Sequence, residues 1–134
     1  IKESGGSCDR VAQMRQSLGD NFLILSGDDS LTLPFMSVGA KGVVSVATNC
    51  YVRDIVKMVD LALKNDYRAA GKLFDKYYPL FKDLFIEPNP VPTKYALLRL
   101  GLIREDSVRL PLAAAADPTR ERIDALVKTL GKAR

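Results

Sequence analysis

The sequence has 134 residues, of which 47% are hydrophobic and 27% are charged, as expected for one globular domain or a piece of one. Its net charge of +4 comes from dispersed basic residues, and no run of about five Lys or Arg marks a nucleic-acid-binding arm. No apolar stretch approaches the ~20 residues that a membrane span needs, so no membrane association is expected.

The absence of histidine narrows the possible chemistry. Ser-His and Cys-His catalysis are excluded within the chain, and no metal site is expected, because Cys8 and Cys50 lack metal-ligand spacing. The two cysteines are predicted to be free thiols in a reducing compartment. Any catalysis must therefore rely on Lys, carboxylates, hydroxyls or backbone groups.

The first half of the chain alternates short apolar runs with amphipathic segments. Runs 22–25 and 42–47 are typical of strands buried on both faces of a parallel sheet. Asp9 is the candidate cap of the first helix and Gly19 its candidate end. The predicted order is strand 1–4, helix 9–18, strand 22–25, helix 30–38, strand 42–47 and helix 53–65. Right-handed parallel crossovers are the expected topology for such short connections.

The second half is predicted to be helical. Asp117 is expected to cap the last helix, Pro118 to open it and Gly131 to end it. Pro79 should kink the first helix of this half, and segment 87–92 is too rich in proline to be helical throughout. The predicted helices are 67–84, 89–101 and 117–131.

Three parallel strands are too few to close a sheet, and they would leave two open edges. An eight-stranded β/α barrel needs about 250 residues. We therefore predict an α/β fold in which residues 1–65 form the last three β/α units of a TIM (β/α)8 barrel. Residues 66–134 are predicted to form a C-terminal helical domain. The N-terminal half of the barrel is expected to be supplied from outside this sequence.

Three residues fall where predicted strands end, which is where TIM barrels place their chemistry. Lys2 ends the first strand, and desolvation at a barrel mouth would favour its neutral, nucleophilic amine. Gly27 follows the second strand and lets a small ligand approach the backbone. Val44 lies near the end of the third strand, where its main chain could bind a carbonyl or carboxylate.

Each of these residues also has a purely structural interpretation. Lys2 could be a surface charge, and Gly27 could be an ordinary turn glycine. Asp28 and Asp29 are better explained as helix caps than as acid/base groups. Glu3 alternates to the face opposite Lys2, which favours a structural partner over a catalytic base.

Five segments carry a recognisable pattern: 1–6 (Ile-Lys-Glu-Ser-Gly-Gly), 25–29 (Leu-Ser-Gly-Asp-Asp), 39–46 (Gly-Ala-Lys-Gly-Val-Val-Ser-Val) followed by Asn49, 87–94 (Glu-Pro-Asn-Pro-Val-Pro-Thr-Lys) and 109–111 (Arg-Leu-Pro). In order and at matching spacing they resemble the dihydrodipicolinate synthases, a family of pyruvate-dependent class I aldolase-type lyases. Segment 1–6 is similar to that family's Schiff-base strand. The resemblance covers essentially the whole chain.

The resemblance implies that Lys2 forms a Schiff base with pyruvate and that the enamine then attacks aspartate 4-semialdehyde. The product would be 4-hydroxy-tetrahydrodipicolinate, on the route to diaminopimelate and lysine. Gly27 and the main chain of Val44 would line the pyruvate site. The resemblance further implies a cytoplasmic homotetramer that needs no cofactor. The proton-relay tyrosine and threonine, the carboxylate-binding arginine and the allosteric lysine site would lie upstream of Ile1, so residues 1–134 alone are expected to be inactive.

Two other functions remain open at this stage. A sister lyase, such as N-acetylneuraminate lyase or a 2-keto-3-deoxy sugar acid aldolase, would share the lysine chemistry and differ in the second substrate. A non-catalytic helical interaction module built on residues 66–134 would share neither. Nucleic-acid binding has no support from the dispersed charge.

Overall fold

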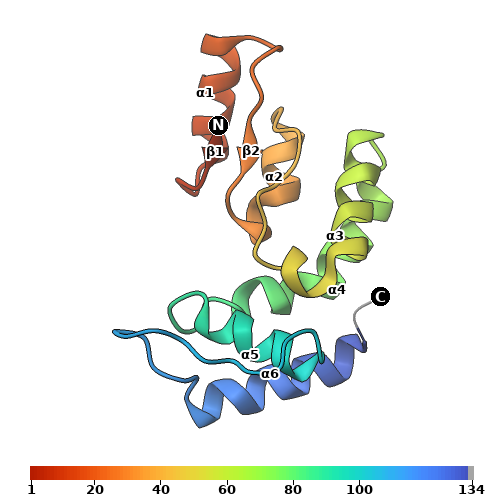
Figure 1. Ribbon diagram of the computed structural model, residues 1–134. Coiled ribbons are helices and arrows are strands. Elements are labelled where there is room, and N and C mark those ends of the chain that lie inside the picture. Colours follow the sequence, from red (N-terminus) through yellow and green to blue (C-terminus); the bar gives the residue numbers. More distant parts are fainter. Residues whose placement is uncertain (133–134) are drawn as a thin grey trace. The chain divides into compact units, whose positions relative to one another are not determined.

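The computed structural model describes residues 1–132, which form two compact units (Figure 1). The β/α unit contains residues 1–45 and 54–74, and the helical unit contains residues 46–53 and the chain from Asp75 onward. The predicted domain boundary after residue 65 lies in the turn between the helices α3 (Thr48–Leu63) and α4 (Tyr67–Asp83). The contact-defined units instead divide within both of these helices, and the division into domains at residue 65 stays a prediction.

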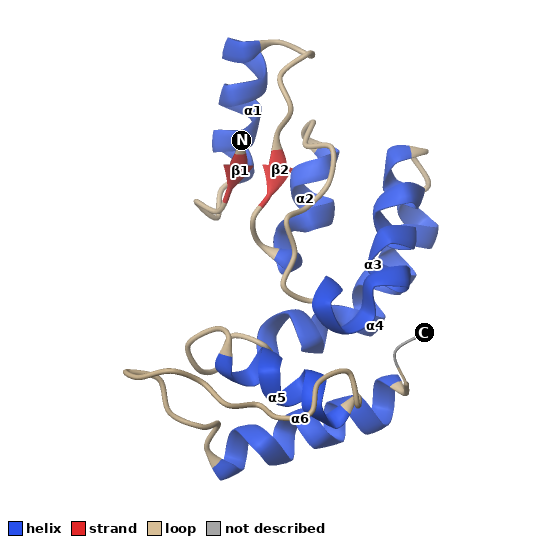
Figure 2. Cartoon of the chain, in the orientation of Figure 1, coloured by secondary structure: helices blue, strands red, loops and turns tan. Residues whose placement is uncertain are grey.

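The β/α unit begins with two short parallel strands joined by a helix. β1 (Lys2–Glu3) pairs with β2 (Leu25–Ser26), with Lys2 opposite Leu25, and helix α1 (Cys8–Leu18) connects them (Figure 2). The predicted end of α1 is confirmed, since Gly19 adopts a φ of 76° there. The predicted cap is wrong. The Ser7 hydroxyl accepts from the Arg10 amide, and Asp9 lies in the first turn instead.

The second predicted strand starts later than the apolar run suggested. Ile24 is fully buried, but Leu23 is 55% exposed and lies outside β2. The third predicted strand, 42–47, is reduced to one parallel bridge between Val43 and Ser26. Its chain turns away early because helix α3 begins at Thr48, where the pattern had suggested Arg53. Tyr51 interrupts α3 with a non-helical conformation, which explains why the regular apolar periodicity starts only after it.

The predicted helix 30–38 is present in two parts. A single 3₁₀ turn, η1 (Asp29–Leu31), leads into α2 (Thr32–Ser37). Met58 is fully buried in α3, whereas Val56, two residues earlier, is 47% exposed. The buried apolar side chains of this unit include Val11, Ile24, Phe35, Ile55 and Met58.

The helical unit contains the second part of α4 with α5 (Val91–Arg99) and α6 (Asp117–Leu130), and α5 packs against α6. Pro79 lies within α4. Helix α6 ends at Gly131 as predicted, but Ala116 is its N-cap residue and Asp117 belongs to its first turn. Helix α5 begins two residues after the predicted start at Asn89, because the Asn89 side chain accepts from the Thr93 hydroxyl and Pro90 is the cap residue.

Tyr51 connects α4 and the end of α6 within this unit. Its ring lies 5.3 Å from that of Tyr77, centroid to centroid, and its hydroxyl donates to the Gly131 carbonyl at 2.9 Å. Burial raises the pKa of Tyr51 to about 12, so the hydroxyl remains a donor. The unit therefore has its own buried core, which includes Tyr77, Leu80, Leu84, Ala96 and Ile123.

Candidate active site

The three predicted site residues lie on three adjacent parallel segments of the small sheet, near the ends of the strands. Lys2 is in β1, Gly27 directly follows β2, and Val44 directly follows the bridge residue Val43. Main-chain hydrogen bonds fix this register. The Gly27 amide donates to the Glu3 carbonyl at 2.7 Å, and the Val44 amide donates to the Ser26 carbonyl at 2.8 Å. The structure thus places Lys2 and Val44 on opposite sides of β2.

Lys2 and Gly27 are in close proximity. A Cβ atom added at Gly27 would lie 2.9 Å from Cε and 3.1 Å from Cγ of Lys2, and only 1.8 Å from Oγ of Ser4. Gly27 does not adopt the positive φ that favours glycine in turns. Glycine is therefore required here for space, because any side chain would displace both Lys2 and Ser4.

Ser4 lies in this candidate site, although the sequence pattern did not single it out. Its hydroxyl occupies the space beside Gly27 on the side where the Lys2 side chain lies. The signal was present in the sequence, because residues two apart on an extended chain face the same way. The structure thus brings together an amine, a hydroxyl and a side-chain-free backbone segment.

Glu3 faces the opposite side and has a structural role, as its alternation with Lys2 predicted. Only 4% of it is exposed, and its carboxylate accepts from Arg10 Nε at 2.9 Å and from the Gly5 amide. The hydrogen bond from Arg10, then that from Gly5, holds the pKa of the Glu3 carboxyl below its usual range. This ionised, fully engaged carboxylate anchors the start of α1 to β1.

The loop after β2 is held by hydroxyl groups. The Ser26 hydroxyl, fully buried, donates to the Asp28 carbonyl at 2.8 Å and accepts from the Asp28 amide at 3.2 Å. The Thr32 hydroxyl donates to the same carbonyl at 3.3 Å. Asp28 occupies the cap position of η1 without a side-chain capping bond, so its predicted capping role is wrong. These bonds fix the backbone on the carboxyl side of Gly27.

Val44 can contribute to a ligand site only in a restricted way. Its amide is engaged by Ser26, so its carbonyl is the main-chain group left to meet a ligand. Its side chain is 44% exposed. Among residues 1–132, no group of three or more carboxylates or thiols is arranged to hold a metal ion. No helix within the same residues is both long enough and apolar enough to cross a membrane.

Comparison with known proteins identifies the family. Residues 1–130 match the Dihydrodipicolinate synthetase family. The chain belongs to this family. The 4-hydroxy-tetrahydrodipicolinate synthase of Persephonella marina is 45% identical over 131 residues, which are 98% of this chain and 45% of that protein. The chain therefore spans about half the length of the curated relatives it matches.

Solved structures of the dihydrodipicolinate synthetase family agree with the fold. The 4-hydroxy-tetrahydrodipicolinate synthase of Methylacidiphilum fumariolicum SolV is 48% identical with a TM-score of 0.93, covering 97% of this chain and 43% of that one. The Acinetobacter baumannii dihydrodipicolinate synthase, solved in complex with pyruvate, is 32% identical with a TM-score of 0.91, covering 97% and 44%. The fold is thus part of a TIM barrel with C-terminal helices, as predicted.

Proposed function

We propose that this chain carries the Schiff-base lysine of a lyase that condenses pyruvate with aspartate 4-semialdehyde, and that Lys2 is that lysine. The observation that carries the proposal is the proximity of Lys2 to Gly27 at the carboxyl ends of two parallel strands. The absence of a side chain at Gly27 lets the Lys2 amine and the Ser4 hydroxyl lie together at these strand ends, where a small 2-oxo acid would bind. The names of the curated relatives support the choice of reaction.

The proposed chemistry follows from an amine at this position. The neutral Lys2 amine adds to the carbonyl carbon of pyruvate, and loss of water gives a protonated imine. A methyl proton then leaves, and its electron pair forms the enamine, with the imine nitrogen as electron sink. The enamine carbon attacks the aldehyde carbon of aspartate 4-semialdehyde. Finally, the amino group of the second substrate attacks the imine carbon, which closes the ring and returns Lys2 as the free amine.

Gly27 and Val44 have distinct parts in this proposal. Gly27 lines the proposed pyruvate site and leaves room for the Ser4 hydroxyl and the Lys2 side chain beside it, and the Val44 carbonyl accepts from a hydrogen-bond donor of the bound intermediate. The proton donors and acceptors of the reaction would come from the N-terminal half of the barrel. By the same resemblance, the assembled enzyme would be a cytoplasmic homotetramer. Residues 1–134 alone should therefore show no turnover.

Borohydride reduction in the presence of pyruvate tests the proposal. In a full-length protein containing this chain, reduction should attach one reduced pyruvate covalently to Lys2, located by peptide mass spectrometry. Lys2→Ala should abolish the attachment and lower kcat by about 10³-fold or more, because the covalent route is lost. Lys41→Ala, at an exposed lysine whose amide donates to the Ile24 carbonyl just before β2, is the matched control and should keep the attachment.

The outcomes separate the competing functions. A full-length protein that traps no pyruvate would contradict the lyase proposal and support the helical interaction module. Trapping at Lys2 combined with turnover of sialic acid or a 2-keto-3-deoxy sugar acid, and none of aspartate 4-semialdehyde, would assign a sister lyase. Normal turnover by residues 1–134 alone would contradict the proposed dependence on an N-terminal half.

A further inference from the structure

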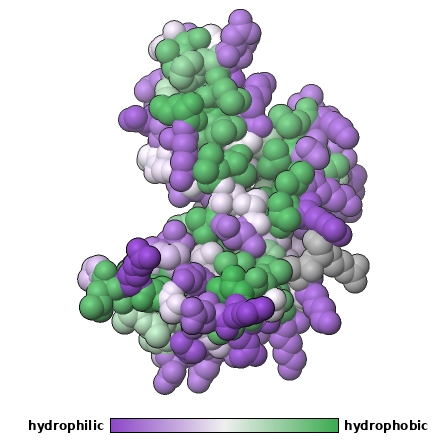
Figure 3. Space-filling model, viewed as in Figure 1, coloured by the Kyte–Doolittle hydropathy of each residue, from purple (hydrophilic) through white to green (hydrophobic). Residues whose placement is uncertain are grey.

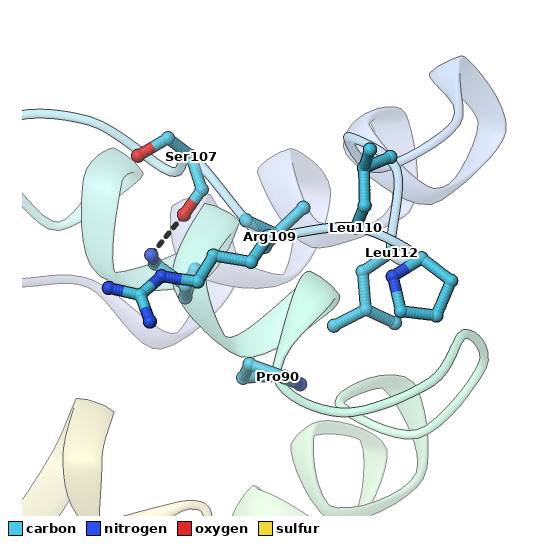
Figure 4. A pocket seen from close by; sticks show the side chains of 8 residues that line it. Pro90, Ser107, Arg109, Leu110 and Leu112 are labelled. Carbon is cyan, nitrogen blue, oxygen red and sulfur yellow. Dashed lines mark hydrogen bonds between the residues drawn. The ribbon is translucent and has the colours of Figure 1, made fainter.

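The helical unit contains a cavity lined by the start of α5 and by the segment between α5 and α6. Its volume is about 640 Å³, within the size range of small-molecule sites. Segment 107–112 lines it together with Pro90 and Lys94, and Figure 4 shows the side chains of these residues. These residues are distant in sequence from Lys2, Gly27 and Val44, and no role in the proposed reaction involves them.

The lining is cationic and contains no acid. Lys94 and Arg109 are its charged members, and the remaining side chains are Pro90, Ser107, Val108, Leu110, Pro111 and Leu112. Asp106, which directly precedes the lining segment 107–112, already accepts a hydrogen bond from Arg120 Nη2 at 3.2 Å. Glu87, on the approach to α5, accepts from the Ala116 amide at 3.0 Å. The positive charge of the cavity is therefore not neutralised by these acids.

Both cations have donor capacity to spare. Lys94 Nζ donates to the Ser107 carbonyl, drawn as a dashed line in Figure 4, and an ammonium has two further N–H groups. Arg109 makes no ion pair within residues 1–132, so all five of its N–H groups are available. The Lys94 bond also holds segment 107–112 against α5, which fixes one side of the cavity.

The apolar side chains of the cavity indicate that its ligand also has an apolar part. In Figure 4, Leu112 points toward Pro90, and Leu110, which also lines the pocket, is 93% exposed. A planar apolar group could pack against Pro90 and Leu112 while an acidic group meets Arg109. Guanidinium groups bind carboxylates through two parallel hydrogen bonds, which gives such a site its geometric selectivity.

We propose that this cavity binds a small organic dicarboxylate with an apolar body, through Arg109 and Lys94. A second cationic pocket in the unit, near Arg99 and Lys128, is less suited to an anion. Its cations lie at the C-terminal ends of α5 and α6, where they complement the partial negative charge of the helix ends. The cations of the 640 Å³ cavity have no such internal complement.

Isothermal titration of the full-length protein with phthalate tests the proposal. Phthalate should bind saturably, and its neutral isostere phthalamide should not. Arg109→Gln should weaken phthalate binding by about tenfold or more, the loss expected for a charge-assisted bidentate contact. Arg109→Lys, which keeps the charge and loses the fork, should fall between the two. Arg104→Gln, an exposed arginine of the same loop outside the cavity, is the matched control and should stay within about twofold.

Several results would overturn the proposal. These are no saturable phthalate binding, equal binding of phthalamide, unchanged affinity in Arg109→Gln, or an equal loss in Arg104→Gln. Phthalate binding that disappears in Lys2→Ala would place the probe at the lysine site and would overturn it as well. Circular dichroism of Arg109→Gln confirms that a loss of binding is not a loss of fold. Because Lys2→Ala should keep phthalate binding, this proposal and the lyase proposal fail independently.

Discussion

Different kinds of interaction stabilise the interior of each of the two units. In the β/α unit, distant segments are joined mainly by main-chain hydrogen bonds, such as those from Leu25 to Ile1 and from Ser26 to Gly42. In the helical unit, they are joined by side chains, among them Tyr51 with Gly131 and Arg122 with Asp83. Main-chain hydrogen bonds of this kind require extended segments that lie side by side. Side-chain contacts require only that complementary faces of two helices meet.

The same contrast is visible at the surface. Within residues 1–132, β1 has a strand neighbour on one side only, and Ile1 and Leu23 beside it are 52% and 55% exposed. Figure 3 shows hydrophobic surface over this part of the β/α unit. An open strand edge with exposed apolar side chains needs further strands to cover it. The helical unit buries Tyr77, Leu80 and Ile123 within itself, so its core depends less on additional strands than that of the β/α unit does.

Gly27→Ala should give the largest effect, and it should be confined to the β/α unit. The new Cβ would collide with Ser4 Oγ and Lys2 Cε, so Lys2 would be displaced. We expect about 10²-fold lower kcat/KM in the full-length protein, and a loss of about 1–3 kcal/mol in the free energy of unfolding. Steady-state kinetics and urea denaturation measure the two effects.

Two further variants show whether the collision is the cause. Adding Ser4→Ala removes the atom that would lie 1.8 Å away, so the double variant should recover part of the lost stability. Gly71→Ala is the matched control, because nothing lies within 4 Å of its added Cβ. In α4 it should stabilise the protein by about 0.5–1 kcal/mol. If Gly27→Ala behaved like Gly71→Ala, the close approach of β1 and β2 would be wrong.

Arg122→Ala should destabilise the helical unit and leave the strands of the β/α unit protected. Arg122 Nε lies 2.8 Å from a carboxylate oxygen of Asp83, whose side chain is only 6% exposed. Removing the arginine leaves that carboxylate buried without its ion-pair partner. We expect a loss of about 1–3 kcal/mol, detected as faster hydrogen exchange in α4 to α6.

The Asp83→Asn change made in the Arg122→Ala background should restore part of this loss, because a neutral amide costs less to bury. Arg104→Ala, at an exposed position, should change stability by less than about 0.5 kcal/mol. Equal exchange rates in both units after Arg122→Ala would show that they unfold together, which would remove the distinction drawn between them.

Glu3→Gln should have the smallest effect of the three changes, a modest loss of stability at neutral pH that disappears on acidification. Because Arg10 lowers the pKa of the folded carboxyl, Glu3 contributes stability above its ordinary value of 4.5, and the contribution is lost as pH falls through the folded pKa. Denaturation midpoints measured from about pH 6 to pH 2 should therefore fall less steeply in Glu3→Gln. Arg10→Gln should flatten the same region. Glu105→Gln, at an exposed position, should retain the steep acid decline.

Much of the architecture was predictable from local pattern. The helices at 9–18, 67–84 and 117–131 are present within one or two residues at each end, since apolar spacing and terminal glycines are local signals. The strands were harder to place. Segment 42–47 has the composition of a strand, but only Val43 makes a bridge, because a strand forms only where a neighbour meets it. The choice of Ser7 over Asp9 as cap was likewise decided by geometry that spacing does not fix.

Some features of the candidate site were likewise predictable from the sequence, and others were not. The order of elements, the resemblance to the family and the positions of Lys2, Gly27 and Val44 near strand ends were all predictable from the sequence. The need for glycine at position 27, the place of Ser4 beside Lys2 and the hydrogen bond of the Val44 amide became visible only in the folded chain. The physical reason is that periodicity and capping act within a few residues of chain. Close packing and hydrogen bonding between residues more than twenty positions apart depend on where the fold brings those residues together.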